Sequence, residues 1–207
     1  MLRPTLAILL CLASVTAHAD EQMRNLTNFK KVSIEGPMNL TVDAGKPFSV
    51  SVQGDAKFIG RVTTRVVNGE LRISMNDESN NNVRKHDRIV ISMPSLTSFD
   101  AEGAGLAQLN NVQGDRLDVD YRGAGRLVIN GKVRHVRIDA EGVGEVDTKG
   151  LIAQEADVSF EGIGAVSIYA SEKLTADVEG MGNLTYYGNP RTVNKSVSGI
   201  GSVTAAR

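Results

Sequence analysis

Acidic side chains recur along the sequence beside pairs of glycines, and their type and spacing suggest cation chemistry. Carboxylate oxygens are the ligands that Ca²⁺ prefers in proteins. If successive copies of the acidic segment stack as strands, equivalent carboxylates lie about 4.8 Å apart. The sequence therefore offers a candidate Ca²⁺ site held by adjacent copies, with Asp100, Glu102, Asp139, Glu141, Glu161, Asp177 and Glu179 as the candidate ligands.

The same carboxylates have a simpler interpretation as a solvated acidic face that keeps the protein soluble and discourages lateral association of sheets. Unscreened like charges at about 4.8 Å cost about 0.9 kcal/mol even in water. Arg122 interrupts the row, and Arg122 and Arg137 are both placed to bridge neighbouring carboxylates. The ligand spacing of a calcium-binding loop is absent, so the solvated face is the favoured interpretation and the cation site is the alternative.

The sequence contains few residues or motifs that indicate catalysis. Beyond residue 19 there are two histidines, His86 and His135, which we expect in an exposed loop and on an outward strand face. Nucleophile-elbow, zinc-protease and phosphate-loop motifs are all absent. We therefore predict no catalytic residues, no cofactor and no enzymatic activity. The alternative is a protein that binds or cleaves polysaccharide with carboxylates and bases on one face, by analogy of fold.

The dominant pattern is a Gly-x-Gly pair that occurs six times, with first glycines 20, 19, 20, 18 and 19 residues apart. No copy completes G-x-G-x-x-G and no helical pattern follows, so a nucleotide-binding role is disfavoured. A sharp corner in every copy brings backbones together and favours glycine. We therefore predict a structural role for Gly103, Gly105, Gly123, Gly125, Gly142, Gly144, Gly162, Gly164, Gly180, Gly182, Gly199 and Gly201.

Each copy alternates apolar and polar residues with period two, which is typical of strands. One copy cannot bury its own apolar face, but stacked copies can. The sequence predicts an all-β fold, a right-handed parallel β-helix-like solenoid with rungs of about 19–20 residues. We expect one domain over residues 20–207, with regular rungs from about residue 95 and an eroded seventh copy at residues 34–40.

The N-terminal part is less regular and is expected to form the start and cap of the solenoid. Asn68-Gly69 between apolar runs predicts a β-hairpin. Residues 76–87 are polar and predict a loop, and no segment has a convincing helical period. The strands expected here cover residues 31–35, 39–44, 48–53, 61–67, 70–75 and 88–93.

The first 19 residues have the pattern of a secretory signal peptide. Arg3 precedes an apolar run over residues 5–15, and Ala17-His18-Ala19 is typical of a cleavage site. The run is too short to span a membrane, which takes about 20 apolar residues. Cys11 follows two leucines, which disfavours a lipoprotein anchor, so cleavage removes the one cysteine and excludes disulfides and thiolate chemistry.

Charge and composition exclude further classes. Loss of Arg3 leaves 22 basic and 24 acidic residues. Nucleic-acid-binding proteins carry clustered basic residues, so this balance disfavours nucleic acid as a partner. Aromatic residues are 4% of the chain and Trp is absent, so platforms for stacking sugars or bases are scarce. Beyond the signal peptide no apolar segment approaches the length of a membrane span.

Several segments resemble the head GIN domain family, whose members are described as auto-transporter adhesins. They are Phe29 to Gly36 (FKKVSIEG), Asn68 to Leu71 (NGEL), Ile91 to Leu96 (ISMPSL) and the E-G-x-G rungs, and the resemblance extends from about Phe29 to Ala205. It implies a right-handed parallel β-helix-like fold in the cell envelope. We expect no translocating barrel after Arg207, which is a departure from the pattern of an auto-transporter.

Together these features predict an exported, non-catalytic binding, adhesin-like or scaffold module in the periplasm or on the outer surface of a Gram-negative-type bacterium. The expected partner is an envelope or extracellular ligand, either glycan or protein. A second alternative is a structural element that self-assembles, because an exposed solenoid end is a template for pairing with another chain.

Overall fold

The computed structural model describes residues 20–75 and 86–206 and is almost entirely β-structure. The signal peptide expected at residues 1–19 and most of the polar loop expected at residues 76–87 lie outside the described residues. The elements are β1 (Asp20–Arg24), β2 (Lys31–Glu35), β3 (Asn39–Ala44), β4 (Ser49–Gly54), α1 (Ala56–Arg61), β5 (Val62–Val67), β6 (Glu70–Met75), β7 (Arg88–Met93), β8 (Ser98–Thr148), β9 (Leu151–Tyr169), β10 (Lys173–Tyr187), β11 (Thr192–Gly199) and β12 (Ser202–Ala205).

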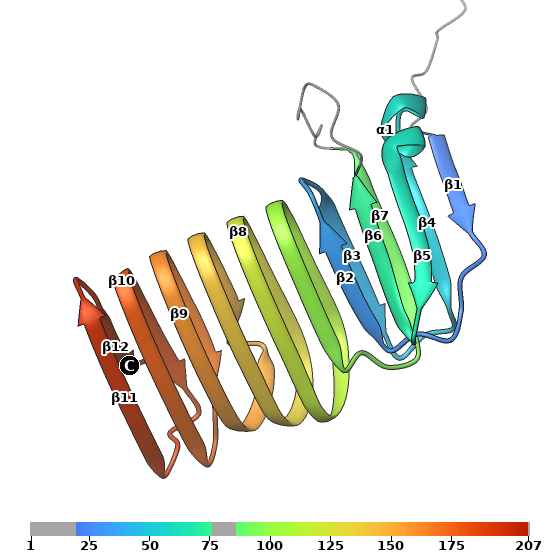
Figure 1. Cartoon of the computed structure of the whole chain (residues 1–207). Helices are drawn as coiled ribbons and strands as arrows, with labels where there is room; N and C mark the ends of the chain where they lie inside the picture. The colour runs from blue at the N-terminus through green and yellow to red at the C-terminus, as the bar shows by residue number, and fades with distance from the viewer. Residues whose placement is uncertain (1–19, 76–85, 207) are drawn as a thin grey trace, which may run out of the picture.

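The glycine repeats form rungs that wind into a coil and stack on one another (Figure 1). β9 pairs in parallel with β8 and β10, and β10 pairs in parallel with β11 and β12. The register places Gly142 opposite Gly162, Gly162 opposite Gly180, and Gly180 opposite Gly199. Each Gly-x-Gly pair therefore lies directly against its equivalent in the next rung.

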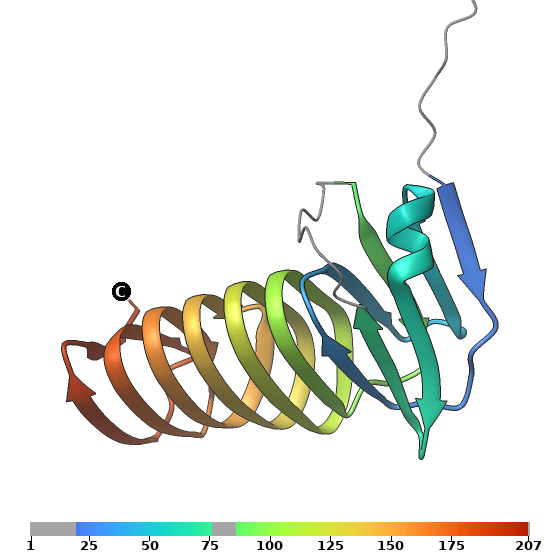
Figure 2. The same cartoon turned by 45° about the horizontal axis from the view of Figure 1, so that its top comes forward.

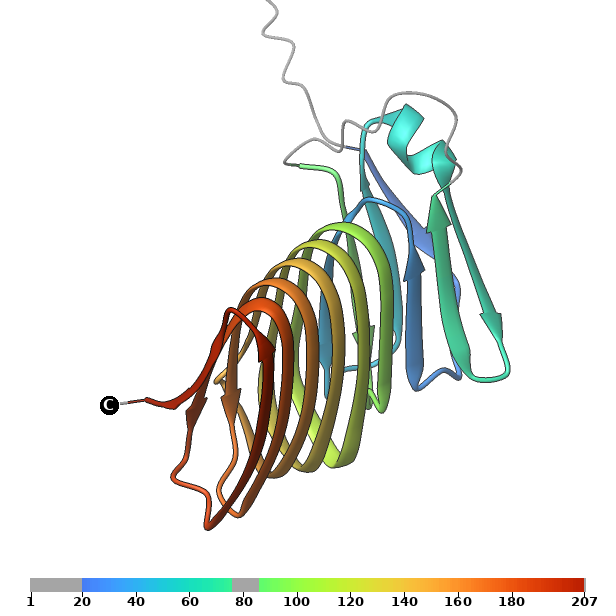
Figure 3. The same cartoon turned by 60° about the vertical axis from the view of Figure 1, so that its left-hand side comes forward.

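Buried apolar residues of β8, β9 and β10 form the core of the coil, whose winding Figure 3 shows. Val136, Ile138 and Ala140 are at most 2% exposed, and the residues between them point outward. Their partners in β9 are Ala156, Val158 and Phe160, which are also buried. Burial of each large aliphatic side chain contributes about 1.5–3 kcal/mol, so the alternation in the sequence provides the driving force for winding.

The glycine corners require the absence of a side chain. Gly123 has φ +148°, and a Cβ built on it overlaps the carbonyl oxygen of Gly103 in the preceding rung. Positive φ values recur at all the repeated glycines except Gly182 and Gly201. At Gly182 a Cβ instead meets the ring of Phe160, and at Gly201 it meets the carbonyl oxygen of Gly182.

The N-terminal strands extend the stack in an order that differs from their order in the chain. β2 lies between β6 and β8, and β3 lies between β7 and β8. The eroded copy expected at residues 34–40 is the rung next to the regular coil, because Gly36 lies against Gly103. β6 and β7, which come later in the chain, lie outside it.

The sheet is mixed, because the outermost strands pair antiparallel. β1 pairs with β4, β4 with β7, and β5 with β6. The N-terminal strands thus form the less regular start that the sequence predicted, and the mixed sheet does not confirm a right-handed parallel β-helix for the chain as a whole. The predicted hairpin is confirmed, with Val67 opposite Glu70 and positive φ at Asn68 (51°) and Gly69 (76°), which is the geometry of a type I′ turn.

Two elements at this end were not predicted from the sequence, β1 and the six-residue helix α1. α1 contacts β1, β4 and β5 and lies at the end of the molecule away from the C-terminus (Figure 2). Asp55 Oδ1 accepts a hydrogen bond of 2.7 Å from the Phe58 N–H, and Phe58 is buried. Arg24 of β1 donates to the Ile59 and Val62 carbonyls at 3.3 and 3.4 Å, which satisfies the C-terminal end of the helix.

Gly123→Ala is expected to lower the free energy of unfolding by about 3 kcal/mol or more, because it adds backbone strain to a backbone clash. Urea unfolding followed by circular dichroism measures this loss. Gly60→Ala is the control, since Gly60 lies in α1 and a Cβ there meets nothing within 4 Å. That substitution is expected to be neutral or to stabilise by about 0.5–1 kcal/mol. Equal stability of the two variants would contradict the role of the corner.

Candidate functional site

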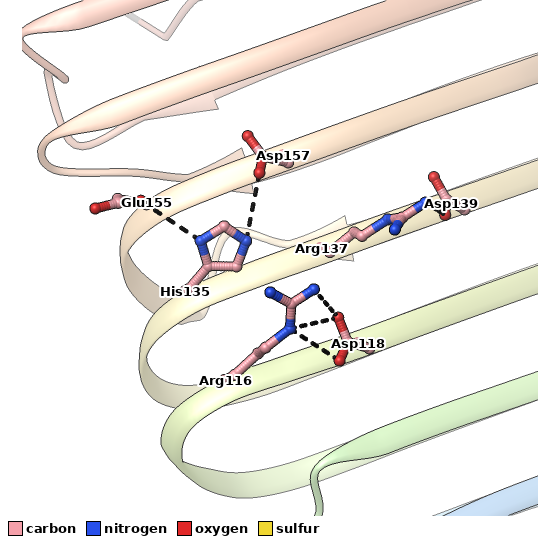
Figure 4. Close-up of polar contacts among 7 residues, drawn as sticks. All are labelled: Arg116, Asp118, His135, Arg137, Asp139, Glu155 and Asp157. Carbon is pink, nitrogen blue, oxygen red and sulfur yellow. Dashed lines mark hydrogen bonds and ion pairs between the residues drawn. The ribbon is translucent and has the colours of Figure 1, made fainter.

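A cluster of charged side chains covers the outward face of three successive rungs before the glycine corner. We call it the charged wall; it consists of Arg116, Asp118, His135, Arg137, Asp139, Glu155 and Asp157 (Figure 4). Strand pairing sets the arrangement, with His135 opposite Glu155 and Arg137 opposite Asp157. Because the apolar residues of the same strands point inward, these charged residues are brought together on one surface.

Most of the charges on this wall are paired with one another. Arg116 Nε donates to both oxygens of Asp118 at 2.8 and 3.0 Å, and this hydrogen bonding holds the pKa of Asp118 below its ordinary value. Arg137 Nη2 donates to Asp139 Oδ2 at 2.8 Å. Exposed pairs of this kind contribute at most about 1 kcal/mol each, so they organise the surface more than they stabilise the fold.

His135 lies between two carboxylates of the neighbouring rung. Its Nδ1 is 3.5 Å from Glu155 Oε2, its Nε2 is 3.3 Å from Asp157 Oδ2, and its side chain is 16% exposed. It points outward as expected but is largely covered. Because both ring nitrogens face carboxylates, the geometry favours a bridge between rungs over a general base. His86, at 56% exposure, has its Nε2 3.8 Å from Asp87.

The seven acidic candidates occupy two rows and do not converge. Glu141, Glu161 and Glu179 stand in one row, and Ser159 separates Asp139 from Asp177 in another. Asp100 and Glu102 lie on the first rung, opposite Ser33 and Glu35 of β2. Over residues 20–75 and 86–206, no three acidic or histidine side chains are placed to hold a metal ion. Arg122 Nε lies 3.7 Å from Glu141, the bridge that the sequence suggested.

The stacking of rungs brings Asp100 close to a second carboxylate, that of Asp120. Burial raises the pKa of Asp100, and the neighbouring Asp120 raises it further. A raised pKa in the folded protein means that the folded state binds more protons than the unfolded chain as pH falls. Stability from this group is therefore lost as pH rises through its folded pKa.

A groove of about 650 Å³ lies at the other corner of the rungs, next to the charged wall. Its lining includes Gln113, Lys132, Arg134, Ile152 and Gln154. Arg134 binds the exposed Asp115 with two hydrogen bonds of 2.6 and 3.1 Å, and this holds the pKa of Asp115 below its ordinary value. The lining thus combines amide and cationic side chains with one exposed isoleucine.

Sequence reasoning missed a line of exposed apolar side chains at the glycine corner. We call it the apolar ridge; it consists of Val143, Ile163, Met181 and Ile200, which are 55%, 49%, 52% and 79% exposed. Each is the middle residue of a Gly-x-Gly pair, and parallel pairing aligns Val143 with Ile163 and Ile163 with Met181. The signal was present in the sequence, because the middle residue of all six pairs is apolar, including Ala104 and Ala124.

The chain matches the family model described as "Putative auto-transporter adhesin, head GIN domain" over residues 28–190. No curated protein matches the sequence. Over the described residues, no helix is long and apolar enough to cross a membrane.

Solved structures share the fold. A putative adhesin from Bacteroides fragilis is similar with a TM-score of 0.77 and 20% identity, over 92% of this chain and 98% of that one. A putative adhesin from Parabacteroides merdae has a TM-score of 0.50 and 15% identity, over 93% and 98% of the two chains. At these identities the likeness concerns the fold alone.

Asp100→Asn is expected to raise the free energy of unfolding at pH 7 by about 0.5 kcal/mol, because it removes a partly buried charge beside Asp120. The gain should shrink as pH falls and Asp100 of the parent protein takes up its proton. Urea unfolding at a series of pH values measures both effects. Asp177→Asn, an exposed position four rungs away, is the control and is expected to change stability little. A loss of stability in Asp100→Asn at pH 7 would contradict the raised pKa.

Proposed function

Because this chain belongs to the head GIN domain family, we propose that it is an exported, adhesin-like module that binds a macromolecular partner and carries out no catalysis. The periplasm and the outer cell surface are the compartments that suit it. The stacked rungs fit a right-handed parallel β-helix, with the mixed N-terminal strands and α1 as its cap.

One observation carries the proposal: the coil presents long in-register rows of side chains on an extended, rigid surface. Repeated rows suit a partner that is itself extended. The charged wall has its acids and bases paired with each other, and His135 has a carboxylate at each nitrogen. This pairing supports a binding role over hydrolysis or elimination, which demand a poised acid and base.

Polysaccharide is the partner that the groove beside the charged wall favours. Lys132, Arg134, Gln113 and Gln154 offer cations and amides in one groove of about 650 Å³. These groups suit the hydroxyl and carboxylate groups of an acidic polymer. Cleavage of the same polymer is the enzymatic alternative, favoured by the closeness of His135 to this groove.

Calorimetric titration with an acidic polysaccharide such as alginate, and with neutral dextran, tests this proposal. We expect binding of alginate without new reducing ends or unsaturated products. Lys132→Gln with Arg134→Gln is expected to weaken binding at low salt about tenfold, which is about 1.4 kcal/mol.

The matched control is Lys46→Gln with Arg72→Gln, which removes the same charge from two exposed ion pairs of the N-terminal part. Equal weakening in both double variants would show attraction by net charge only. Product formation would establish the enzymatic alternative, and the absence of binding to both polymers would remove polysaccharide as the partner.

Self-assembly is a second candidate, favoured by the strands at the C-terminal end. No residue of β11 is buried. This includes Val197, although strand pairing aligns it with Val178 and Phe160, whose side chains are buried in the core. Among the described residues, β11 and β12 pair only with β10. Unpaired strand edges are templates for pairing with another chain.

If the ends associate, the mass measured by light scattering rises with protein concentration, and Val197→Lys abolishes the rise. Met23→Lys, at another exposed apolar residue of 59% exposure, is the control that should leave association unchanged. A monomer mass at all concentrations would exclude this candidate.

A further inference from the structure

We infer that the apolar ridge is a docking surface for a cationic, amphipathic α-helix of a protein partner. The inference rests on the proposed binding function and names a partner class for a surface separate from the polysaccharide groove. Four of the eight large apolar side chains that are exposed among the described residues lie in this single line. Apolar residues scattered over a surface are ordinary, whereas a contiguous exposed patch marks an interaction site.

The ridge is exposed because glycines flank it on both sides. Gly142, Gly162 and Gly180 align on one side, and Gly144, Gly164 and Gly182 align on the other. With no side chains in these two rows, the apolar residues stand above bare backbone. Ile200 continues the line, since its N–H donates to the Gly180 carbonyl at 2.8 Å and Gly199 lies opposite Gly180. A partner can therefore contact the ridge from above and from both sides.

A row of carboxylates runs parallel to the ridge. Glu141, Glu161 and Glu179 each lie two residues before a ridge residue and stand opposite one another in consecutive rungs. Glu141 has Arg122 at 3.7 Å, whereas Glu161 and Glu179 have no ion pair within the described part of the chain. On the other flank the row is Glu145, Ala165 and Asn183. The ridge is thus apolar, with a row of carboxylates along one side. An amphipathic helix whose apolar stripe is bordered by Lys or Arg is complementary to it.

The spacing of the ridge selects a helix over a strand. Neighbouring rungs lie about 4.8 Å apart, and a helix presents one residue per turn on a given line every 5.4 Å or so. Same-side residues of a strand repeat at about 6.6 Å. Over three steps a helix drifts by about 2 Å from the ridge, whereas a strand drifts by about 5 Å, more than one rung. A helix of about three turns matches the four ridge residues.

Other occupants fit the ridge less well. Anionic lipid headgroups are repelled by Glu141, Glu161 and Glu179. Arg122, the basic residue next to them in this row, is paired with Glu141. A second copy would bring an identical acidic flank. A standard interface also buries about 800 Å² on each partner, which is more than four half-exposed side chains present. A short helical segment needs a smaller contact area, which the four ridge residues provide.

The probe is a synthetic peptide of about 15 residues with leucines at helical spacing and lysines along one border of the leucine stripe. Fluorescence anisotropy measures its binding to the protein that spans residues 20–207. We expect saturable binding that weakens with salt. A peptide of the same composition with the leucines scrambled, and a peptide with glutamates in place of lysines, are each expected to bind at least about tenfold more weakly.

The ridge is tested by Ile163→Ser with Met181→Ser, both exposed positions whose replacement removes apolar contact. This variant is expected to weaken peptide binding about tenfold while alginate binding is unchanged. Glu161→Gln with Glu179→Gln is expected to weaken binding and to reduce its dependence on salt. Ile152→Ser is the control, since Ile152 is 41% exposed at the opposite corner. Thermal unfolding verifies that each variant is folded.

Each other outcome overturns the inference. Absence of peptide binding, equal weakening by Ile152→Ser, or binding that is indifferent to the ridge substitutions excludes the ridge as the docking surface. Preferential binding to phosphatidylglycerol or phosphatidylcholine vesicles assigns the ridge to a lipid surface, and a mass that doubles with concentration and is abolished by the ridge variant assigns it to a second copy. If alginate binding persists while peptide binding fails, only this inference falls; if all binding fails, the proposed function falls with it.

Discussion

The close approach of backbone to backbone at the glycine corner constrains the rest of the molecule. At Gly123 the carbonyl oxygen of Gly103 occupies the space that a Cβ takes in any other residue, and the same contact recurs at Gly142 and Gly162. Because only glycine fits, each rung is held in register with the one before it. One slipped residue would both create a clash and turn the apolar side chains outward. The corner thus couples local backbone geometry to the burial of the whole core.

Because the register is fixed, equivalent residues of successive rungs line up in rows. These rows determine the chemistry of the surface. Unlike charges in adjacent positions form ion pairs, as at Arg116 with Asp118 and Arg134 with Asp115. Like charges repel, as Asp100 shows beside Asp120. Apolar residues at the crest of the corner become a continuous ridge. A surface made of rows is suited to extended partners, which is compatible with the adhesin-like description of the family.

The two ends of the stack are built differently. At one end the strands β1, β4 and β5 pair antiparallel and α1 packs against them, with Phe58 buried and Arg24 hydrogen bonded to the end of the helix. At the other end no residue of β11 is buried, and Val197, which strand pairing aligns with the buried Val178, is exposed. This asymmetry means that association through the ends, where it occurs, involves the β11 and β12 edges more readily than the helix-covered end.

Local patterns determined much of this protein. Period-two alternation identified the strands, Asn68-Gly69 identified the hairpin, and the glycine spacing identified the corners, because each depends on neighbouring residues alone. The helix α1 was not predicted because six residues are too few to show a helical period. The strand β1 was not predicted because it is exposed at nearly every position and shows no alternation. Tertiary structure alone decided that β6 and β7 stack outside β2 and β3 and that His135 bridges Glu155 and Asp157. The physical reason is that these features depend on pairing between segments about 20 or more residues apart, and a sequence pattern records which face a residue takes but not which strand lies beside it.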